Sequence, residues 1–123
     1  MFGFHIRTDE ARASSQIHRI AKNSEVLEIG DAVQEDAGFA LASANSDRIV
    51  GFAAETFTFA SDNQTVLMRE IAMIPAWQGM EVECDLDAAS TQVLAVGKYA
   101  VLTGATGAMQ LSQSSLSATV GQF

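Results

Sequence analysis

Apolar and polar residues alternate along much of the chain, and turn-forming residues interrupt the alternation about every eight to twelve positions. The alternation is clearest in residues 81–87, where Val82, Cys84 and Leu86 alternate with four carboxylates. A period of two places alternate side chains on opposite faces of a β-strand. We therefore expect a strand with one face in a core and an acidic face in water, and Cys84 to be a small core residue.

The first fifteen residues are expected to form an extended N-terminal arm. Phe2, Phe4 and Ile6 alternate with small or polar residues, and a polar stretch follows them. Such a segment is compatible with two structures. It is either an ordinary first strand of the domain's own sheet or a strand that adds to the sheet edge of a neighbouring molecule.

From residue 16 onward, short β-branched or apolar runs between turn residues predict a series of strands. The expected strands cover residues 16–21, 25–29, 39–42, 48–59, 65–74, 81–87, 98–103 and 108–112. Residues 88–96 are expected to form a short helix or a loop. The pattern predicts an all-β fold, a small antiparallel barrel or sandwich of about seven to eight short strands. Residues 16–123 would form this single domain, ending in a Ser-rich tail.

Composition supports one globular domain. The chain has 123 residues, of which 48% are hydrophobic and 18% charged. No apolar run approaches the roughly 18 residues of a membrane span, and the N-terminus lacks the features of a secretory signal. The single cysteine, Cys84, cannot form an internal disulfide. We therefore expect synthesis and folding in a cytoplasm and no contact with a membrane.

Charge is unevenly distributed along the chain. Residues 1–22 carry four basic and two acidic residues, a net charge of +2, whereas residues 23–123 carry three basic and thirteen acidic residues, a net charge of −10. An acidic body repels phosphate backbones and disfavours nucleic-acid binding. The basic residues Arg7, Arg12 and Arg19 either contact an acidic partner or are simply solvated.

The motifs found do not support catalysis or a cofactor. Residues 101–107 resemble the opening of a dinucleotide-binding loop, but Gln110 stands where the third glycine is needed. A straight row of carboxylates in residues 81–87 does not converge as a calcium site must. His5 and His18 lack a nucleophile motif nearby. We predict no catalytic, cofactor-binding or metal-binding residue.

Trp77 is the only tryptophan and follows the only proline, Pro75. It is either a core residue or an exposed anchor for a binding partner, since tryptophan is common in both settings.

Several segments together resemble small decoration, or cement, proteins of tailed-phage capsids. The resemblance lies in a Gly-Asp turn before a short strand, a glycine turn, a polar loop, an Ile-Val-Gly-Phe strand, and a later strand and hairpin. The segments are residues 17–20, 29–33, 38–40, 46–52, 81–85 and 96–109. The similarity covers roughly residues 16–112 and lies in the order and spacing of these strands and turns.

This resemblance implies a structural virion protein that binds the outer surface of a capsid and stabilises the shell. Its partner would be the major capsid protein, it would form a homo-oligomer, with a trimer favoured, and it would need no cofactor. The candidate partner-binding residues are Phe2, Phe4, Ile6, Arg7, Arg12, Arg19 and Trp77. The alternative is a small-molecule or carbohydrate-binding β-barrel module with a pocket lined by Phe52, Phe57, Phe59 and Tyr99. A small hydrolase or lyase ranks below both.

Overall fold

The computed structural model confirms the all-β fold. It describes residues 3–6, 16–44, 48–77, 80–85, 87, 99–112, 117 and 122–123. These residues form eleven short strands and one helical turn, so the strands are shorter and more numerous than the alternation predicts. No described helix is long and apolar enough to cross a lipid bilayer. The expected helix or loop at 88–96 and most of the Ser-rich tail lie outside the described residues.

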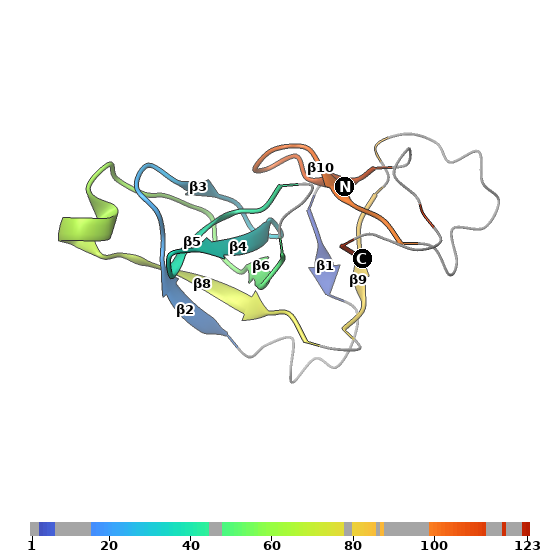
Figure 1. The fold of residues 1–123 in the computed structure, drawn as a ribbon, viewed down its shortest axis with the longest axis horizontal. Coiled ribbons are helices and arrows are strands. Elements are labelled where there is room, and N and C mark those ends of the chain that lie inside the picture. The colour runs from blue at the N-terminus through green and yellow to red at the C-terminus, as the bar shows by residue number, and fades with distance from the viewer. Residues whose placement is uncertain are drawn as a thin grey trace.

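A five-stranded antiparallel sheet forms the larger part of the molecule (Figure 1). In spatial order its strands are β2 (Ile17–Ile20), β8 (Glu70–Pro75), β6 (Gly51–Ala53), β4 (Ala32–Asp36) and β5 (Phe39–Ala42). The sheet curls so far that Ala21, just after one edge strand, forms an isolated bridge with Ala40 in the other. This single bridge brings the edges together without closing a barrel.

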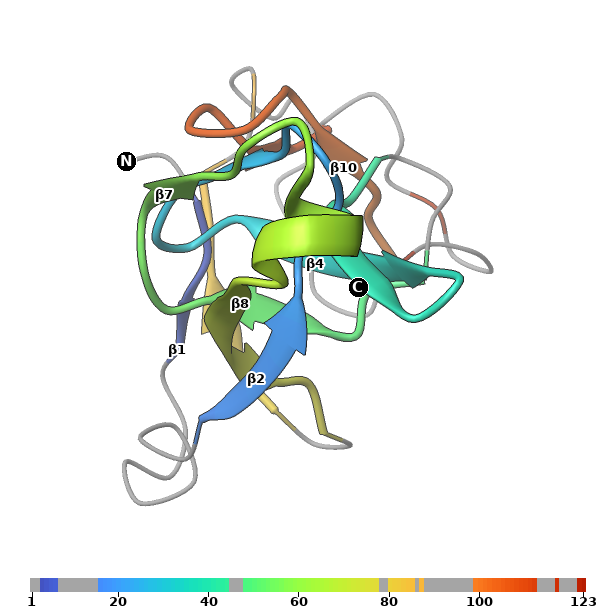
Figure 2. The same cartoon turned by 90° about the vertical axis from the view of Figure 1, so that its left-hand side faces the viewer.

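Three two-stranded sheets complete the described fold. They pair β1 (His5–Ile6) with β9 (Val82–Glu83), β3 (Val26–Leu27) with β7 (Phe57–Thr58), and β10 (Leu102–Thr103) with β11 (Gln110–Leu111). The helical turn η1 (Asn63–Leu67) lies at one end of the long axis, and β1, β9 and β10 lie toward the other (Figure 1). Figure 2 looks along this axis with η1 in front.

Two hydrophobic clusters use opposite faces of the same strands. Val33 and Ala53 belong to a cluster with Leu27, Phe59, Ile71 and Met73. Their neighbours Ala32 and Phe52, which are paired across β4 and β6, belong to a second cluster with Phe4, Leu102 and Met109. Successive residues of a strand point to opposite faces, so one sheet supplies both cores.

The prediction of a single strand over residues 48–59 is wrong. This segment is divided into β6 and β7, with a bend at Ala54 and Glu55. The Glu55 carboxylate accepts a hydrogen bond from the backbone N–H of Ala72 at 3.0 Å. The Glu55 side chain therefore takes the Ala72 N–H group that the backbone of a longer β6 would have bonded, and the pairing of β6 with β8 ends there.

The expected strand over residues 65–74 is also too long. Its first part lies in η1, and only β8 is extended. Asn63, which the sequence marks as a turn residue, is buried and hydrogen-bonds to the backbone around it. This local bonding by an Asn side chain competes successfully with strand pairing.

Several other predictions are confirmed. The strand over 16–21 is β2, the strand at 39–42 is β5, and residues 98–112 contain the β10–β11 hairpin. In residues 81–85 the half-buried and exposed side chains alternate as expected.

A contact that the sequence did not predict joins the five-stranded sheet to the β10–β11 hairpin. Asp31 is 1% exposed, and its carboxylate accepts hydrogen bonds from the Glu28 N–H at 2.9 Å, the Gly107 N–H at 3.0 Å and the Thr106 hydroxyl. The Gly-Asp turn before β4 is thereby fastened to the turn of the β10–β11 hairpin.

Candidate interaction sites

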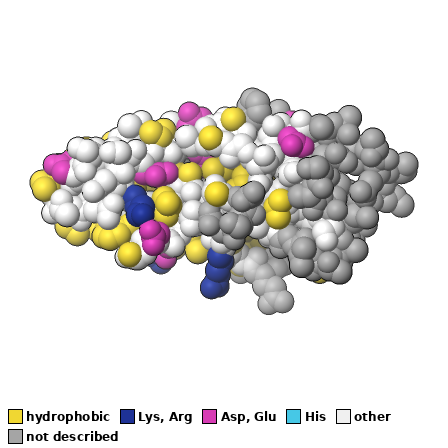
Figure 3. Space-filling view, turned by 45° about the horizontal axis from the view of Figure 1, so that its top comes forward, with side chains coloured by type: hydrophobic (Ala, Val, Ile, Leu, Met, Phe, Trp, Pro, Cys, Tyr) yellow, Lys and Arg dark blue, Asp and Glu magenta, His cyan; other side chains and the backbone are white. Residues whose placement is uncertain are grey.

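Three consecutive apolar side chains protrude from the end of the molecule formed by η1. Val66, Leu67 and Met68 are 67%, 58% and 51% exposed. Hydrophobic side chains are visible at this left-hand end in Figure 3. Single exposed apolar residues are ordinary, but a run of three exposed in succession is unfavourable unless it has a use. We call these three residues the apolar knob.

The backbone beneath the apolar knob is held by a network of hydrogen bonds. Buried Asn63 donates through Nδ2 to the carbonyl oxygens of Ala21 at 2.8 Å and Arg69 at 3.0 Å, and accepts from the Arg69 N–H at 3.0 Å. Asn23 and Gln64 exchange reciprocal bonds of 2.9 and 2.7 Å between backbone N–H groups and side-chain oxygens. The knob is therefore fixed before any partner binds.

The turn itself has an uncommon geometry. The Met68 N–H donates to the carbonyl oxygen of Asn63 at 2.7 Å, which closes a π-type turn, and Met68 has a left-handed backbone with φ of 52°. Single π turns occur frequently at functional sites, and a left-handed non-glycine residue costs of order 1–2 kcal/mol. The Arg69 guanidinium lies 3.7 Å from the centroid of the Phe57 ring and secures the next residue to the body.

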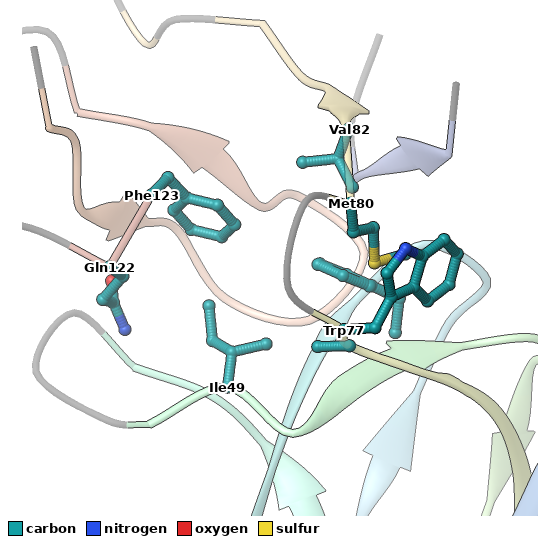
Figure 4. A pocket seen from close by; sticks show the side chains of 8 residues that line it. Ile49, Trp77, Met80, Val82, Gln122 and Phe123 are labelled. Atoms are coloured by element: carbon teal, nitrogen blue, oxygen red, sulfur yellow. The ribbon is translucent and has the colours of Figure 1, made fainter. Parts of the chain in front are cut away.

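An apolar pocket lies beside Trp77, next to the second hydrophobic cluster (Figure 4). Its volume is about 200 Å³. The lining residues come from three distant stretches of the chain, and they are Ile49, Phe52, Ala76, Trp77, Met80, Val82, Gln122 and Phe123. We call it the Trp77 pocket. Trp77 is half-buried at its wall, so its position combines packing with access from solvent.

The wall formed by Phe123 is held by stacking and by backbone bonds. The Phe123 ring stacks on Phe4 with centroids 4.8 Å apart, and Phe4 in turn contacts Phe52 at 5.2 Å. The Phe123 N–H and carbonyl bond with the backbone of Ala100 at 3.0 and 2.9 Å. The Gln122 side chain donates to the Ala44 carbonyl at 2.8 Å. These contacts shape the pocket without any ligand.

A second, open groove runs beside β1. Its volume is about 410 Å³, and its walls come from β1 on one side and from β6, β8 and the turn at Gly30 on the other. The β9 strand pairs with one edge of β1. A groove along a strand edge suits an extended peptide, which can add to that edge as a further strand.

Those candidate partner-binding residues that the structure describes do not gather at one site. Phe4 is buried in the second hydrophobic cluster, and Ile6 pairs with Val82 in β9, so residues 3–6 are part of the domain's own body. Arg19 forms an ion pair of 3.0 Å with Glu35 of the same chain. Phe2, Arg7 and Arg12 lie outside the described residues. Trp77 lines the Trp77 pocket, whereas Phe4 and Ile6 line the groove beside β1.

The pocket expected for a binding module is wrong in its composition. Phe52 lines the Trp77 pocket, whereas Phe59 is buried in the other hydrophobic cluster and Phe57 packs against it at 4.9 Å. Tyr99 is exposed at an isolated bridge with Ser117. Phe52 and the pair Phe57 and Phe59 belong to different hydrophobic clusters, so the four aromatic residues do not line one pocket.

Groups with reactive chemistry are dispersed. Within the described ranges no three His, Cys, Asp or Glu side chains converge as metal ligands. Cys84 is half-buried beside the second cluster, and burial, followed by the nearby Asp85 charge, raises the pKa of its thiol. A raised pKa leaves the thiol protonated and weakly nucleophilic.

Sequence reasoning missed the apolar knob because residues 65–74 have the composition of a buried strand. A run of three apolar residues directly after a strong turn was the available signal. Comparisons of the chain with protein-family models, with curated proteins and with solved structures gave no match.

Proposed function

We propose that this chain is a structural, non-enzymatic protein that binds the outer surface of a tailed-phage capsid and stabilises the shell. It acts there as a homo-oligomer, with a trimer favoured, and needs no cofactor. The observation that carries the proposal is the apolar knob, because a rigidly held, exposed apolar projection is typical of a protein that docks onto other proteins. The resemblance of residues 16–112 to capsid decoration proteins supplies the kind of partner.

Two further features support a mechanical role. Strand pairs resist shear well because their hydrogen bonds lie across the direction of load, and the Asp31 contact ties the hairpin to the main sheet. The groove beside β1 is suited to an extended segment of the major capsid protein, which would bind by strand addition. The basic lead of the chain would then face the shell while the acidic body faces solvent.

The test mixes the purified chain with capsids stripped of their outer-surface proteins, pellets the capsids and measures the bound chain. We expect saturable binding and DNA retention to a higher temperature. Arg7→Glu with Arg12→Glu should weaken binding, whereas Arg48→Glu serves as a matched control. Arg19 is left unchanged because its partner Glu35 is in the same chain. Failure of the chain to pellet with capsids at any concentration would refute the proposal.

The Trp77 pocket favours a second candidate, a small-molecule or carbohydrate-binding module. Its volume of about 200 Å³ is below the roughly 300–1,000 Å³ of common ligand pockets, so this candidate ranks second. Saturable stabilisation of the chain by a sugar or metabolite in a melting assay would reverse the order.

A further inference from the structure

We propose that Gln122 and Phe123 of one copy of this chain dock on a neighbouring copy, in the place where each copy here holds its own. We call these two residues the docking pair, and we call the groups that hold them the seat. The inference rests on the proposed function, since it names the contact that joins copies on a shell. It uses neither the apolar knob nor the groove beside β1.

The backbone of the docking pair is bound as a separate extended peptide would be. The Gln122 and Phe123 N–H groups donate to the carbonyl oxygen of Ala100 at 2.8 and 3.0 Å, and the Ala100 N–H donates to the Phe123 carbonyl oxygen at 2.9 Å. Main-chain bonds of this kind fix an added segment on an exposed edge in peptide complexes. They use backbone atoms only, so a second chain can supply them equally well.

The Gln122 side chain is recognised at both ends of its amide. Its Oε1 accepts from the Leu102 N–H at 2.8 Å, and its Nε2 donates to the Ala44 carbonyl oxygen at 2.8 Å. A glutamate has nearly the same shape but no N–H to donate, so its carboxylate would face the Ala44 carbonyl oxygen without a bond. The seat therefore selects glutamine over glutamate.

Phe123 gives the docking pair an apolar anchor. Its ring stacks on Phe4 with centroids 4.8 Å apart and planes inclined by 15°, and it packs against the second hydrophobic cluster. Figure 4 shows Gln122 and Phe123 together on one wall of the Trp77 pocket. The seat therefore accepts a glutamine followed by an aromatic residue.

A second copy of this chain is the occupant that these contacts favour. The docking pair that fits the seat is the chain's own, so every copy carries both halves of the contact. A pair docked on a neighbour keeps the same bonds and stacking, so exchange loses no contact and links two molecules. Because each copy gives one pair and receives one, the exchange closes into a ring, such as a trimer, where the rotation between copies permits.

The reach of the docking pair limits exchange to touching copies. Ser117 exchanges hydrogen bonds of 2.6 and 2.9 Å with the backbone of Tyr99, and Gln122 follows Ser117 in the sequence after residues 118–121. Five residues span at most about 18 Å, so a pair whose Ser117 stays in place reaches only a copy in direct contact. Copies packed side by side on a shell meet this condition continuously, which raises the effective concentration of the neighbour's seat.

The first test supplies the docking pair from a separate peptide. The full chain with Phe123→Ala keeps the seat but lacks the anchoring ring, and its melting temperature is followed while a synthetic peptide of residues 117–123 is added. We expect a saturable rise. A peptide with Phe123→Ala should bind at least about tenfold more weakly, and one with Gln122→Glu about fivefold more weakly, as loss of a side-chain hydrogen bond predicts.

The second test detects exchange between full chains by cross-linking. In a Cys84→Ser background, Gly121→Cys places a thiol beside the docking pair of one variant, and Ala44→Cys places a thiol beside the seat of another. The two variants are mixed and treated with a short bis-maleimide. Each chain carries one thiol, so a pair docked on its own chain gives no product, and a mixed dimer reports a pair beside a neighbour's seat.

Controls separate exchange from collision. On stripped capsids, and at about 1 mM in solution, the mixed dimer should form at least about tenfold faster than with Thr65→Cys, which is exposed on η1, in place of Ala44→Cys. Adding Gln122→Glu to the Gly121→Cys chain should slow the reaction about fivefold, because its pair competes poorly with the receiving chain's own. Gln34→Glu, which removes an amide-to-carbonyl bond of 3.2 Å outside the seat, should leave the rate unchanged. Melting curves check that each variant is folded.

Cross-linking no faster than the Thr65→Cys control would overturn the inference, as would a peptide that does not bind or that binds equally well with Gln122→Glu. Capsid pelleting separates this result from the proposed function. A chain that pellets with capsids but cross-links only at the control rate refutes only the inference. One that cross-links at about 1 mM but never pellets refutes only the capsid role.

Discussion

Thr106 and Asp31 lie 75 residues apart in the sequence and are joined by a hydrogen bond from the Thr106 hydroxyl to the Asp31 carboxylate. The same carboxylate accepts from two backbone N–H groups, so it connects the main sheet to the hairpin. Because Asp31 is buried, its loss would leave these donors without partners in a place water reaches poorly.

Replacing Asp31 should therefore destabilise the whole domain. We expect Asp31→Ala to lower the free energy of unfolding by about 3 kcal/mol, since several bonds to a buried charged group are lost. Urea unfolding measures the change. The control is Asp36→Ala, which removes an exposed ion pair with Lys22 and should cost less than about 1 kcal/mol. Equal effects of the two variants would contradict the proposed importance of the buried carboxylate.

Asn63 should determine the stability of the backbone beneath the apolar knob. Asn63→Ala removes three hydrogen bonds and leaves buried backbone groups without partners, so we expect a loss of about 2–3 kcal/mol. Hydrogen exchange should show faster exchange at the Arg69 N–H in particular. Thr65→Ala, an exposed change in the same turn, should leave exchange unchanged; if it has the same effect, the network is not what holds the turn.

Two glycines have nearly the same backbone φ, so substitutions there distinguish the energetic cost of backbone strain from that of a steric clash. Gly38 and Gly104 have φ of 87° and 85°. A Cβ at Gly38 meets no atom within 4 Å, but one at Gly104 collides with the Ala108 carbonyl oxygen. Gly38→Ala should cost about 1–2 kcal/mol from backbone strain alone, and Gly104→Ala at least about 1 kcal/mol more. Thermal unfolding at matched pH compares them, and indistinguishable losses would contradict the predicted clash.

The Cys84 thiol should react slowly in the folded chain. Burial, and secondly the Asp85 charge, raises the pKa of this thiol, so the reactive thiolate is scarcer at a given pH. Alkylation followed across pH should show its midpoint at higher pH for the folded chain than for the chain in urea. Coincident midpoints would refute the shift, and Cys84→Ser verifies that the label is on this residue.

The same shift has a defined sign for stability. The unfolded chain releases the thiol proton at lower pH than the folded chain does, so the folded state binds more protons in the intervening range. The contribution of Cys84 is therefore fully present below the ordinary pKa of a thiol and is lost as pH rises through its raised pKa in the folded chain.

The sequence predicted those features of the fold that depend on local alternation. The alternation of exposed and half-buried residues over 81–85 and the hairpin around Gly104 followed from side-chain period and turn residues alone, although only Val82–Glu83 of the strand expected over 81–87 form a strand, β9. The break at Glu55 and the turn at Asn63 were not predicted, since each depends on a side chain that satisfies the backbone of a distant or neighbouring segment.

The candidate sites were less predictable than the fold. Trp77 was identified, with burial and exposure both left open, and the structure places it half-buried at a pocket wall. The partners that form this pocket, such as Ile49 and Phe123, come from remote positions that no spacing rule connects. Arg19 was expected to be available to a partner, but Glu35 is brought beside it by the curl of the sheet.

The pairing of β1 with β9 has a consequence for how the chain reaches its native state. His5 lies opposite Glu83, and Ile17 lies opposite Met73, so these paired strands are separated by long stretches of chain that contain other strands. Contacts of such wide sequence separation require costly loop closure before they contribute, which gives β-rich domains folding times of about milliseconds to seconds rather than microseconds. Fragments that lack either partner strand keep short-range hairpins such as β4–β5 but lose these distant pairings, so they should not reach the native fold.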